Sequence, residues 1–326
     1  MNNITLREIA SRIRETERMI ILTHDRPDGD TIGSAYAIKN AFPDREIYVI
    51  NDCVLSGRLA FVAGGDSDLS PDRIAPDFCP DLVMAVDIAS LELAGKCGER
   101  YANRIDIRID HHAMGQDFAQ YNYTDPHSAS CGEIIFDLLR ELDAVNARTA
   151  APLYAAICSD TGSFRYSSVT ADTYRKAAAL VETGIDFSGI AARMVACKTA
   201  QEVRAIRAGY ELLRFHRNGQ IASILFTSQK KSELNLAEED LCVLASLPKE
   251  IDGVQLSIVI KQCSDDVSRF KISMRSEPSI AANALCALFG GGGHLCAGGA
   301  TVTAATPEEA EQTVLSRVFA KLDGDL

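Results

Sequence analysis

Carboxylates and imidazoles gather at four places in the first half of the sequence. The segment THDRPDGD, residues 23–30, carries His24, Asp28 and Asp30 as H-x-x-x-D-x-D. Three further segments, VDIAS, IDHH and SDTGSF, add three aspartates and two histidines: Asp87, Asp110, His111, His112 and Asp160. Such oxygen and imidazole donors suit two divalent cations of the manganese, magnesium or iron type. Four of the aspartates, Asp28, Asp30, Asp87 and Asp160, would balance the four positive charges of two dications, and without metal they would raise one another's pKa values.

Each of these signals has a plainer interpretation when taken alone. The first motif could be a polar loop, Asp87 a helix cap, and the His111–His112 pair part of a surface loop. Adjacent side chains on an extended backbone point in opposite directions, so we expect one histidine to bind metal and the other to serve the substrate or leaving group. Gly29 separates Asp28 from Asp30, and we expect both to project to the same side of an extended or turning backbone.

The elements that must position these residues alternate between strand and helix. Helical patterns cover residues 4–18 and 31–41, and apolar strand patterns cover residues 19–23, 46–51, 82–89 and 105–110. This alternation predicts an α/β fold, a parallel sheet with helices on both faces, in which the charged clusters follow the strand ends. Residues 130–133 have capping-box spacing, and we expect their polar groups only to begin a helix.

A second, smaller α/β domain is expected toward the C-terminus. Strand patterns return at IASILFT, VQLSIVIKQ and SRFKISMRS, after a helical stretch of mixed polarity. We therefore divide the chain into a first domain over residues 1–186, a helical connector over 187–216 and a second domain over 217–326.

Composition restricts the classes of partner. The 326-residue chain has a formal net charge of −12, which argues against binding to long duplex nucleic acid but not to a short anionic ligand. No signal peptide and no apolar run of membrane-spanning length is recognisable. Its ten cysteines are scattered without a C-x-x-C pair, which predicts reduced core thiols in a cytoplasmic protein away from membranes.

The four motifs, in this order and spacing, resemble those of the DHH phosphoesterase superfamily. The tail FGGGGHLCAGGA, with ISMRS before it, resembles the glycine-rich signature of the associated DHHA1 domain, and the whole is similar to the bacterial type with oligoribonuclease and 3′-phosphoadenosine-5′-phosphate (pAp) phosphatase activity. The resemblance implies a DHH catalytic domain followed by a DHHA1 substrate-binding domain.

The same resemblance implies roles for individual residues. One manganese ion would bind to His24, Asp28 and Asp87, and a second to Asp30, Asp87, His111 and Asp160, with magnesium or cobalt as alternatives. The catalytic group would comprise His111, His112, which faces the scissile phosphate, and Asp110, which orients its neighbours more than it binds metal.

The substrate's terminal phosphate would be held by Arg275 and His294, beside a close-approach loop formed by Gly291, Gly292 and Gly293. One departure concerns Ala297-Gly298-Gly299, where the family commonly has Ala-Ala-Gly; we expect the missing methyl group to loosen this loop.

The implied reaction is hydrolysis at the ribose 3′-oxygen, with two metal ions activating the attacking water. Substrates would be short RNA oligonucleotides such as pApA, and pAp, both releasing AMP. Two alternatives stay open, a catalytically inactive nucleotide sensor and a DHH-family inorganic pyrophosphatase, and a homodimer is a further option.

Overall fold

The computed structural model describes residues 2–55 and 57–325, apart from the side chains of Asn2 and His294. The chain forms two compact units, Met1–Cys197 and Lys198–Leu326. The predicted connector, residues 187–216, is therefore divided between them: its first part belongs to the N-terminal unit and the rest to the C-terminal unit. Its role as a connector stays a prediction.

A six-stranded sheet forms the centre of the N-terminal unit, with strand order β1-β6-β5-β4-β2-β3 and every pair parallel. Its inner strands are apolar because both faces are covered. The strands are β1 (Asn2–Asn3), β2 (Arg18–Leu22), β3 (Glu46–Ile50), β4 (Leu82–Val86), β5 (Ile107–Asp110) and β6 (Tyr121–Thr124).

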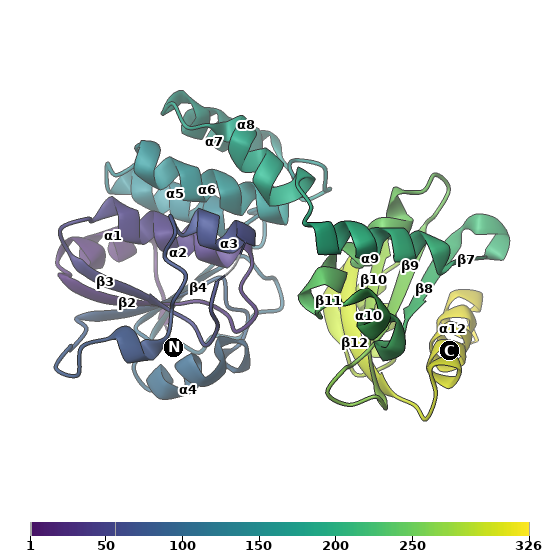
Figure 1. The fold of residues 1–326 in the computed structure, drawn as a ribbon. Coiled ribbons are helices and arrows are strands. Elements are labelled where there is room, and N and C mark those ends of the chain that lie inside the picture. The colour runs from purple at the N-terminus through teal and green to yellow at the C-terminus, as the bar shows by residue number, and fades with distance from the viewer. Residues whose placement is uncertain (1, 56, 326) are drawn as a thin grey trace. The chain divides into compact units, whose positions relative to one another are not determined.

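Helices cover both faces of this sheet, as predicted (Figure 1). The larger core lies between the sheet and α1, α2, α5 and α6, and a smaller core lies on the opposite face beside η2 and α4. The helical elements are α1 (Leu6–Arg14), α2 (Gly29–Ala41), α3 (Gly57–Val62), η1 (Pro71–Arg73), η2 (Leu91–Ala94), α4 (Gly95–Tyr101), α5 (Cys131–Glu141), α6 (Ala147–Asp160), α7 (Ala171–Glu182), α8 (Phe187–Ala191) and η3 (Ala192–Ala196).

Two predicted helices have different boundaries in the structure. The first helix is shorter than residues 4–18, because Thr5 and Glu8 form a capping box at its start and the backbone leaves the helix at Glu15. The second helix begins at Gly29 rather than at residue 31, because Asp28 caps it. This earlier start places Asp30 in the first helical turn.

The C-terminal unit contains a mixed six-stranded sheet with the order β11-β12-β10-β9-β8-β7. Only β8 and β9 pair in parallel; the other pairs are antiparallel. Its elements are α9 (Ala200–Glu211), β7 (Leu213–His216), η4 (Arg217–Gly219), β8 (Ile221–Phe226), α10 (Ser228–Leu234), η5 (Glu239–Ala245), η6 (Leu247–Glu250), β9 (Leu256–Gln262), β10 (Arg269–Ser276), α11 (Ala282–Ala287), β11 (Gly292–His294), β12 (Ala297–Thr303) and α12 (Pro307–Asp323).

One face of this second sheet packs against α11 and α12, and the other packs partly against α9 and η5. Strand β10 alternates strictly between these faces, with Phe270, Ile272 and Met274 buried and Lys271, Ser273 and Arg275 half-buried. The alternation fixes which side chains share the less covered face.

All ten cysteines lie in the described part of the chain and are free thiols. Five of them are buried, as the prediction of core thiols requires. Cys79, Cys197 and Cys242 are exposed, so that prediction is wrong for these three. Among the described residues, no helix combines the length and the apolar character needed to cross a membrane.

Candidate metal centre and substrate-binding residues

The predicted ligands lie at the carboxyl edge of the N-terminal sheet. Strands β2, β4 and β5 are neighbours and run parallel, so their carboxyl ends meet at one edge. His24 lies shortly after β2, Asp87 directly after β4, and Asp110 ends β5. Open parallel sheets bind ligands at this edge.

The first cluster contains His24, Asp28 and Asp87, whose ligand atoms lie within 4.8 Å of one another. Nε2 of His24 is 3.8 Å from Oδ1 of Asp28 and 3.8 Å from Oδ2 of Asp87. Asp28 also caps α2, and its Oδ1 accepts hydrogen bonds from the amides of Asp30 and Thr31. The cap therefore fixes the carboxylate that faces His24.

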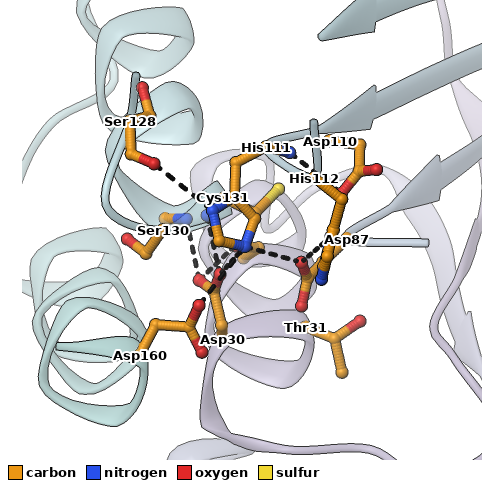
Figure 2. A network of polar contacts seen from close by, with 12 residues as sticks. Asp30, Thr31, Asp87, Asp110, His111, His112, Ser128, Ser130, Cys131 and Asp160 are labelled. Atoms are coloured by element: carbon orange, nitrogen blue, oxygen red, sulfur yellow. Dashed lines mark hydrogen bonds and ion pairs between the residues drawn. The ribbon is translucent and has the colours of Figure 1, made fainter. Parts of the chain in front are cut away.

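Asp30, His111 and Asp160 form a second cluster (Figure 2), again with ligand atoms within 4.8 Å. Nε2 of His111 is 3.2 Å from Oδ2 of Asp160 and 3.9 Å from Oδ2 of Asp30. These side chains come from the end of α6, the segment after β5 and the first turn of α2. Three elements distant in sequence thus converge.

The expectation that Asp28 and Asp30 project to the same side is wrong. Asp28 is the cap of α2 and Asp30 is its second helical residue. Because the backbone of Asp28 is still extended while that of Asp30 is helical, the two carboxylates face different imidazoles, Asp28 that of His24 and Asp30 that of His111. Each aspartate therefore serves a different cluster.

Asp87 lies between the two clusters. Its Oδ2 faces His24, and its Oδ1 is 3.6 Å from Nε2 of His111. The residue has a φ of +59°, a left-handed conformation that aspartate tolerates better than most residues. Its Oδ1 is buried and accepts no hydrogen bond from the described residues, so the site leaves one carboxylate oxygen for a cation.

Electrostatics at this edge favour cations. Burial, followed by neighbouring carboxylates, raises the pKa of Asp30 and of Asp87 well above the ordinary value for aspartate. Burial by itself would lower the pKa of His111, but Asp160 and Asp30 raise it to about 9. Crowded carboxylates that resist ionisation, together with an unsatisfied oxygen, are typical of a divalent-metal site.

The donor set therefore fits divalent metal ions, and these acidic and histidine clusters could bind them. All six predicted ligands are brought together: His24, Asp28, Asp30, Asp87, His111 and Asp160. The assignment of each ligand to a particular ion stays a prediction. A third overlapping group joins Asp87, His111 and His112.

Asp110 contacts His112 and a fully buried arginine. Its Oδ1 lies 2.7 Å from Nδ1 of His112, and its Oδ2 accepts a hydrogen bond from Arg108. Arg108 also donates to the carbonyl of Ile88 at 2.7 Å and to Oγ1 of Thr124 at 2.9 Å. Hydrogen bonding to His112 and the positive charge of Arg108 outweigh burial and lower the pKa of Asp110. The orienting role predicted for Asp110 has a structural basis here.

His111 is oriented by its other ring nitrogen. Its Nδ1 donates to the carbonyl oxygen of Ser128 at 3.3 Å, which favours the tautomer with a metal-binding Nε2. The rings of His111 and His112 meet at 61°, with their centroids 4.6 Å apart. Both rings also lie near Oδ1 of Asp87, His111 at 3.6 Å and His112 at 3.7 Å, so the division of the two histidines between metal and substrate stays a prediction.

The N-terminus of α5 supplies a contact that the sequence analysis missed. The backbone amides of Cys131 and Gly132 donate to Asp30 at 2.6 and 2.8 Å. Ser130 does cap the helix, accepting from the amide of Glu133. The expectation that this segment only begins a helix is nevertheless wrong, because its amides also hold a predicted ligand at the positive end of the helix.

Two further residues that contact the predicted site residues were missed, and the sequence pattern could have indicated one of them. Arg108 stands beside two aspartates in the strand IDIRID, where charged residues alternate with isoleucines, and an arginine and an aspartate in a central strand indicate a buried ion pair. Asn51 donates to the carbonyl of His24 at 2.5 Å and to Oγ1 of Thr23 at 2.8 Å, which holds the backbone before the first motif. The contact made by Asn51 has no recognisable sequence signal.

The predicted phosphate-binding residues lie in the C-terminal unit. Arg275 is on β10, opposite Ala297 of β12, and the backbone of His294 pairs with Ala297 from the other side. The side chain of His294 lies outside what the structure describes, so its role stays a prediction.

Glycines near Arg275 fall into two groups. A Cβ on Gly291 would lie 2.1 Å from the carbonyl of Gly299, and one on Gly293 would lie 2.3 Å from the carbonyl of Ala297. The fold itself requires these two glycines. A Cβ on Gly292 would meet nothing within 4 Å, and one on Gly299 only a carbonyl at 3.6 Å, so packing does not explain those two.

The loosening expected at Ala297-Gly298-Gly299 is not what the structure shows. A Cβ on Gly298 would lie 2.7 Å from Sγ of Cys286 and 3.0 Å from the carbonyl of Ala282. Glycine here permits α11 to pack closely against β12. The missing methyl group tightens the packing.

Comparisons with known proteins agree with this geometry. Residues 18–157 match the DHH family, N-terminal domain. The chain is 29% identical over 299 residues to a probable bifunctional oligoribonuclease and PAP phosphatase NrnA of Streptococcus mutans, covering 90% of this chain and 92% of that protein. It is 27% identical over 322 residues to the bifunctional oligoribonuclease and PAP phosphatase NrnA of Thermus thermophilus, covering 97% and 94%.

The fold has a solved counterpart of nearly the same extent. A crystal structure of an exopolyphosphatase-related protein from Bacteroides fragilis superposes with a TM-score of 0.86 at 23% identity, covering 97% of this chain and 95% of that one. The parallel-sheet unit with its edge of aspartates and histidines therefore matches the DHH family, N-terminal domain, over residues 18–157, within a chain similar over most of its length to bifunctional oligoribonucleases and PAP phosphatases.

Proposed function

We propose that this protein is a manganese-dependent phosphoesterase that hydrolyses short oligoribonucleotides, such as pApA, to 5′-mononucleotides and converts pAp to AMP. The observation that carries the proposal is the pair of donor clusters that meet at Asp87. Relatives named for these two activities, similar over most of the chain, support the choice of substrates.

In this proposal His24, Asp28 and Asp87 hold one ion, and Asp30, Asp87, His111 and Asp160 hold the other. Bound divalent ions would polarise the phosphoryl oxygens and lower the pKa of the attacking water. The cap of α2 fixes Asp28, and the amides of α5 fix Asp30, so both carboxylates are oriented before any ligand binds.

His112 is the residue that we propose for the scissile phosphate. Its Nδ1 is engaged by Asp110 at 2.7 Å, so Nε2 is the ring nitrogen that can contact a phosphoryl oxygen or the leaving ribose oxygen. Asp110 lies between His112 and the buried guanidinium of Arg108. This arrangement holds the imidazole in one tautomer and one orientation.

Phosphate binding by Arg275 and His294, with the glycines around them, completes the proposal. Arg275 projects from the less covered face of the C-terminal sheet. The bare backbone at Gly292 and Gly299 would let a ligand approach closely. We assign the terminal 5′-phosphate of the substrate to this place.

The net charge of −12 favours short ligands held by a few local cations over long duplexes. A cytoplasmic location without membrane association belongs to the same proposal, on the basis of the scattered cysteines. A homodimer remains an option, which light scattering after gel filtration would test.

The direct test incubates the purified protein with 5′-phosphorylated diadenylate and Mn²⁺, beside an EDTA control and the Asp87→Ala variant. AMP released only by the manganese-loaded wild type would support the proposal, and parallel assays with Mg²⁺ and Co²⁺ would identify the preferred ion. Asp117→Asn, at an exposed aspartate, is the matched control and should retain full activity.

Two other results would identify the alternatives. Tight binding of the dinucleotide without turnover under any of these metals would favour a nucleotide sensor. Hydrolysis of inorganic pyrophosphate, without release of AMP from the dinucleotide, would favour a pyrophosphatase.

A further inference from the structure

Two lysines face each other on adjacent strands of the C-terminal sheet. Lys261 of β9 and Lys271 of β10 are direct antiparallel partners, so their side chains share one face. Arg275, four residues farther along β10, lies on the same face because strand side chains alternate. Three cations therefore line one side of two neighbouring strands.

This like-charge pair is not balanced by the described residues. Lys261 is only 9% exposed, yet neither Lys261 nor Lys271 forms an ion pair with any residue that the structure describes. Glu238 is the carboxylate near both lysines, and it is bound to a third one, Lys231. Burial, the dominant influence, lowers the pKa of Lys261.

Such an arrangement is unfavourable in the absence of an anion. Like charges directly opposite on neighbouring strands destabilise a sheet, and a buried cation without a partner is costly. Lys231 already uses its ammonium for Glu238 and for the carbonyl of Gln262 at 2.5 Å. The uncompensated charge of Lys261 and Lys271 therefore indicates a site for an external anion.

The surface beside these lysines is suited to an extended ligand. Next to Lys271 on the same face lie Ser273 and, opposite it on β12, Gly299, which in turn pairs with Gly292 of β11. Neither glycine is required by packing. Lys271 and Arg275 stand four strand positions apart, about 13 Å between their backbone positions, with Ser273 between them on the same face, so the lysine pair and Arg275 occupy two successive places along β10.

We propose that Lys261 and Lys271 form a second phosphate site, separate from that of Arg275, which binds an internal phosphodiester of an oligonucleotide longer than a dinucleotide. Lysine serves phosphate as a mobile point charge, and two of them on one face can share a single phosphodiester. This inference rests on the proposed function and extends it: the lysine pair would select for chain length, because pAp has no phosphate left to occupy it.

The test compares 5′-phosphorylated triadenylate with pAp, using Lys271→Gln and Lys261→Met. We expect each variant to lower kcat/KM for the triadenylate by about 10-fold and to leave pAp hydrolysis within about two-fold of wild type. The slope of log affinity against log salt concentration for the triadenylate should fall by about 0.7 for each lysine removed. Lys271→Arg should retain most of the activity.

The matched control is Lys230→Gln on α10, where a partly exposed lysine pairs with Glu233; hydrolysis of neither substrate should be affected. Equal losses on both substrates, or no loss on the triadenylate, would overturn the inference while leaving the proposed function intact. If the wild type hydrolysed neither substrate, the proposed function would fail, and binding of triadenylate against pAp to wild type and Lys271→Gln would still decide the inference. Thermal unfolding identifies any variant that fails to fold. If Lys261→Met fails to fold, the inference is decided by Lys271→Gln alone, because Lys271 is the less buried of the two lysines.

Discussion

Oδ1 of Asp110 lies 2.7 Å from Nδ1 of His112, while Oδ2 of the same carboxylate accepts from the buried guanidinium of Arg108. Asp110 and Arg108 are completely buried, whereas His112 is partly exposed. The relationship connects a fixed ion pair inside the sheet edge with the imidazole that we place next to the substrate. A change in the Asp110–Arg108 ion pair should therefore alter the orientation of His112 and, through it, the rate of hydrolysis.

Asp110→Asn tests this connection. An amide cannot balance the charge of Arg108 and supports the His112 tautomer less well, so we expect kcat on pApA to fall by about 10- to 100-fold with little change in KM. Steady-state kinetics would measure the split. A rise in KM with kcat unchanged would show instead that Asp110 acts in binding.

Asp87→Asn tests the link between the two clusters. Asparagine tolerates the left-handed backbone at this position. The change also removes a buried negative charge that the neighbouring carboxylates repel. We expect the metal-free variant to unfold at a temperature equal to or above that of metal-free wild type. Saturating Mn²⁺ should raise the wild-type Tm by about 5–10 °C and that of the variant far less.

Differential scanning fluorimetry with and without EDTA would provide these values, with Asp117→Asn as the control that keeps the full metal-induced shift. An equal shift in Asp87→Asn would show that Asp87 does not bind metal.

Lys176→Met tests how much the ion pairs between α7 and α5 stabilise the N-terminal unit. Lys176 of α7 lies 2.7 Å from Asp137 and 3.6 Å from Glu133, both on α5, the helix whose amides hold Asp30. Only 9% of its side chain is exposed, whereas Asp137 is partly open to solvent, so we expect a loss of about 2–3 kcal/mol in the free energy of unfolding.

The pH dependence of this effect follows from the direction of the shift. Burial by itself lowers the pKa of Lys176, but Asp137, Glu133 and Asp172 raise it above the ordinary lysine value of 10.5. A raised pKa means that the stabilisation is complete below that ordinary value and is lost only as pH rises through the folded-state pKa. Urea unfolding should therefore give the same difference at pH 6 and pH 9. Arg175→Met, at an exposed neighbour of Asp172, should cost less than about 0.5 kcal/mol.

Gly299→Ala and Gly298→Ala separate the two kinds of glycine in the C-terminal unit. At Gly299 a methyl group meets only ordinary contacts, so we expect an unchanged Tm and a KM for pApA raised by about 10-fold, because the ligand can no longer approach the backbone. At Gly298 the methyl group would press on Cys286 and Ala282, so we expect a lower Tm and a loss of about 1–3 kcal/mol in the free energy of unfolding through overpacking. The reverse pattern would contradict this division.

The sequence by itself determined the chemistry and the class of the N-terminal fold. His24, Asp87 and His111 follow recognisable apolar strands, and parallel strands present their carboxyl ends at one edge. Local periodicity therefore predicted that these donors would gather at one edge, and their residue types indicated divalent ions. The apolar runs of the second domain likewise predicted its strands.

Tertiary structure alone decided how the donors are divided and supported. Asp28 and Asp30 separate because α2 begins at Gly29, and Asp30 is held by α5 amides from more than a hundred residues later in the chain. Contacts over such separations depend on how elements pack, which local patterns do not encode. The same reason applies to Gly298 and Gly299, two adjacent and chemically identical residues: one faces a packed helix, the other an open face of the sheet.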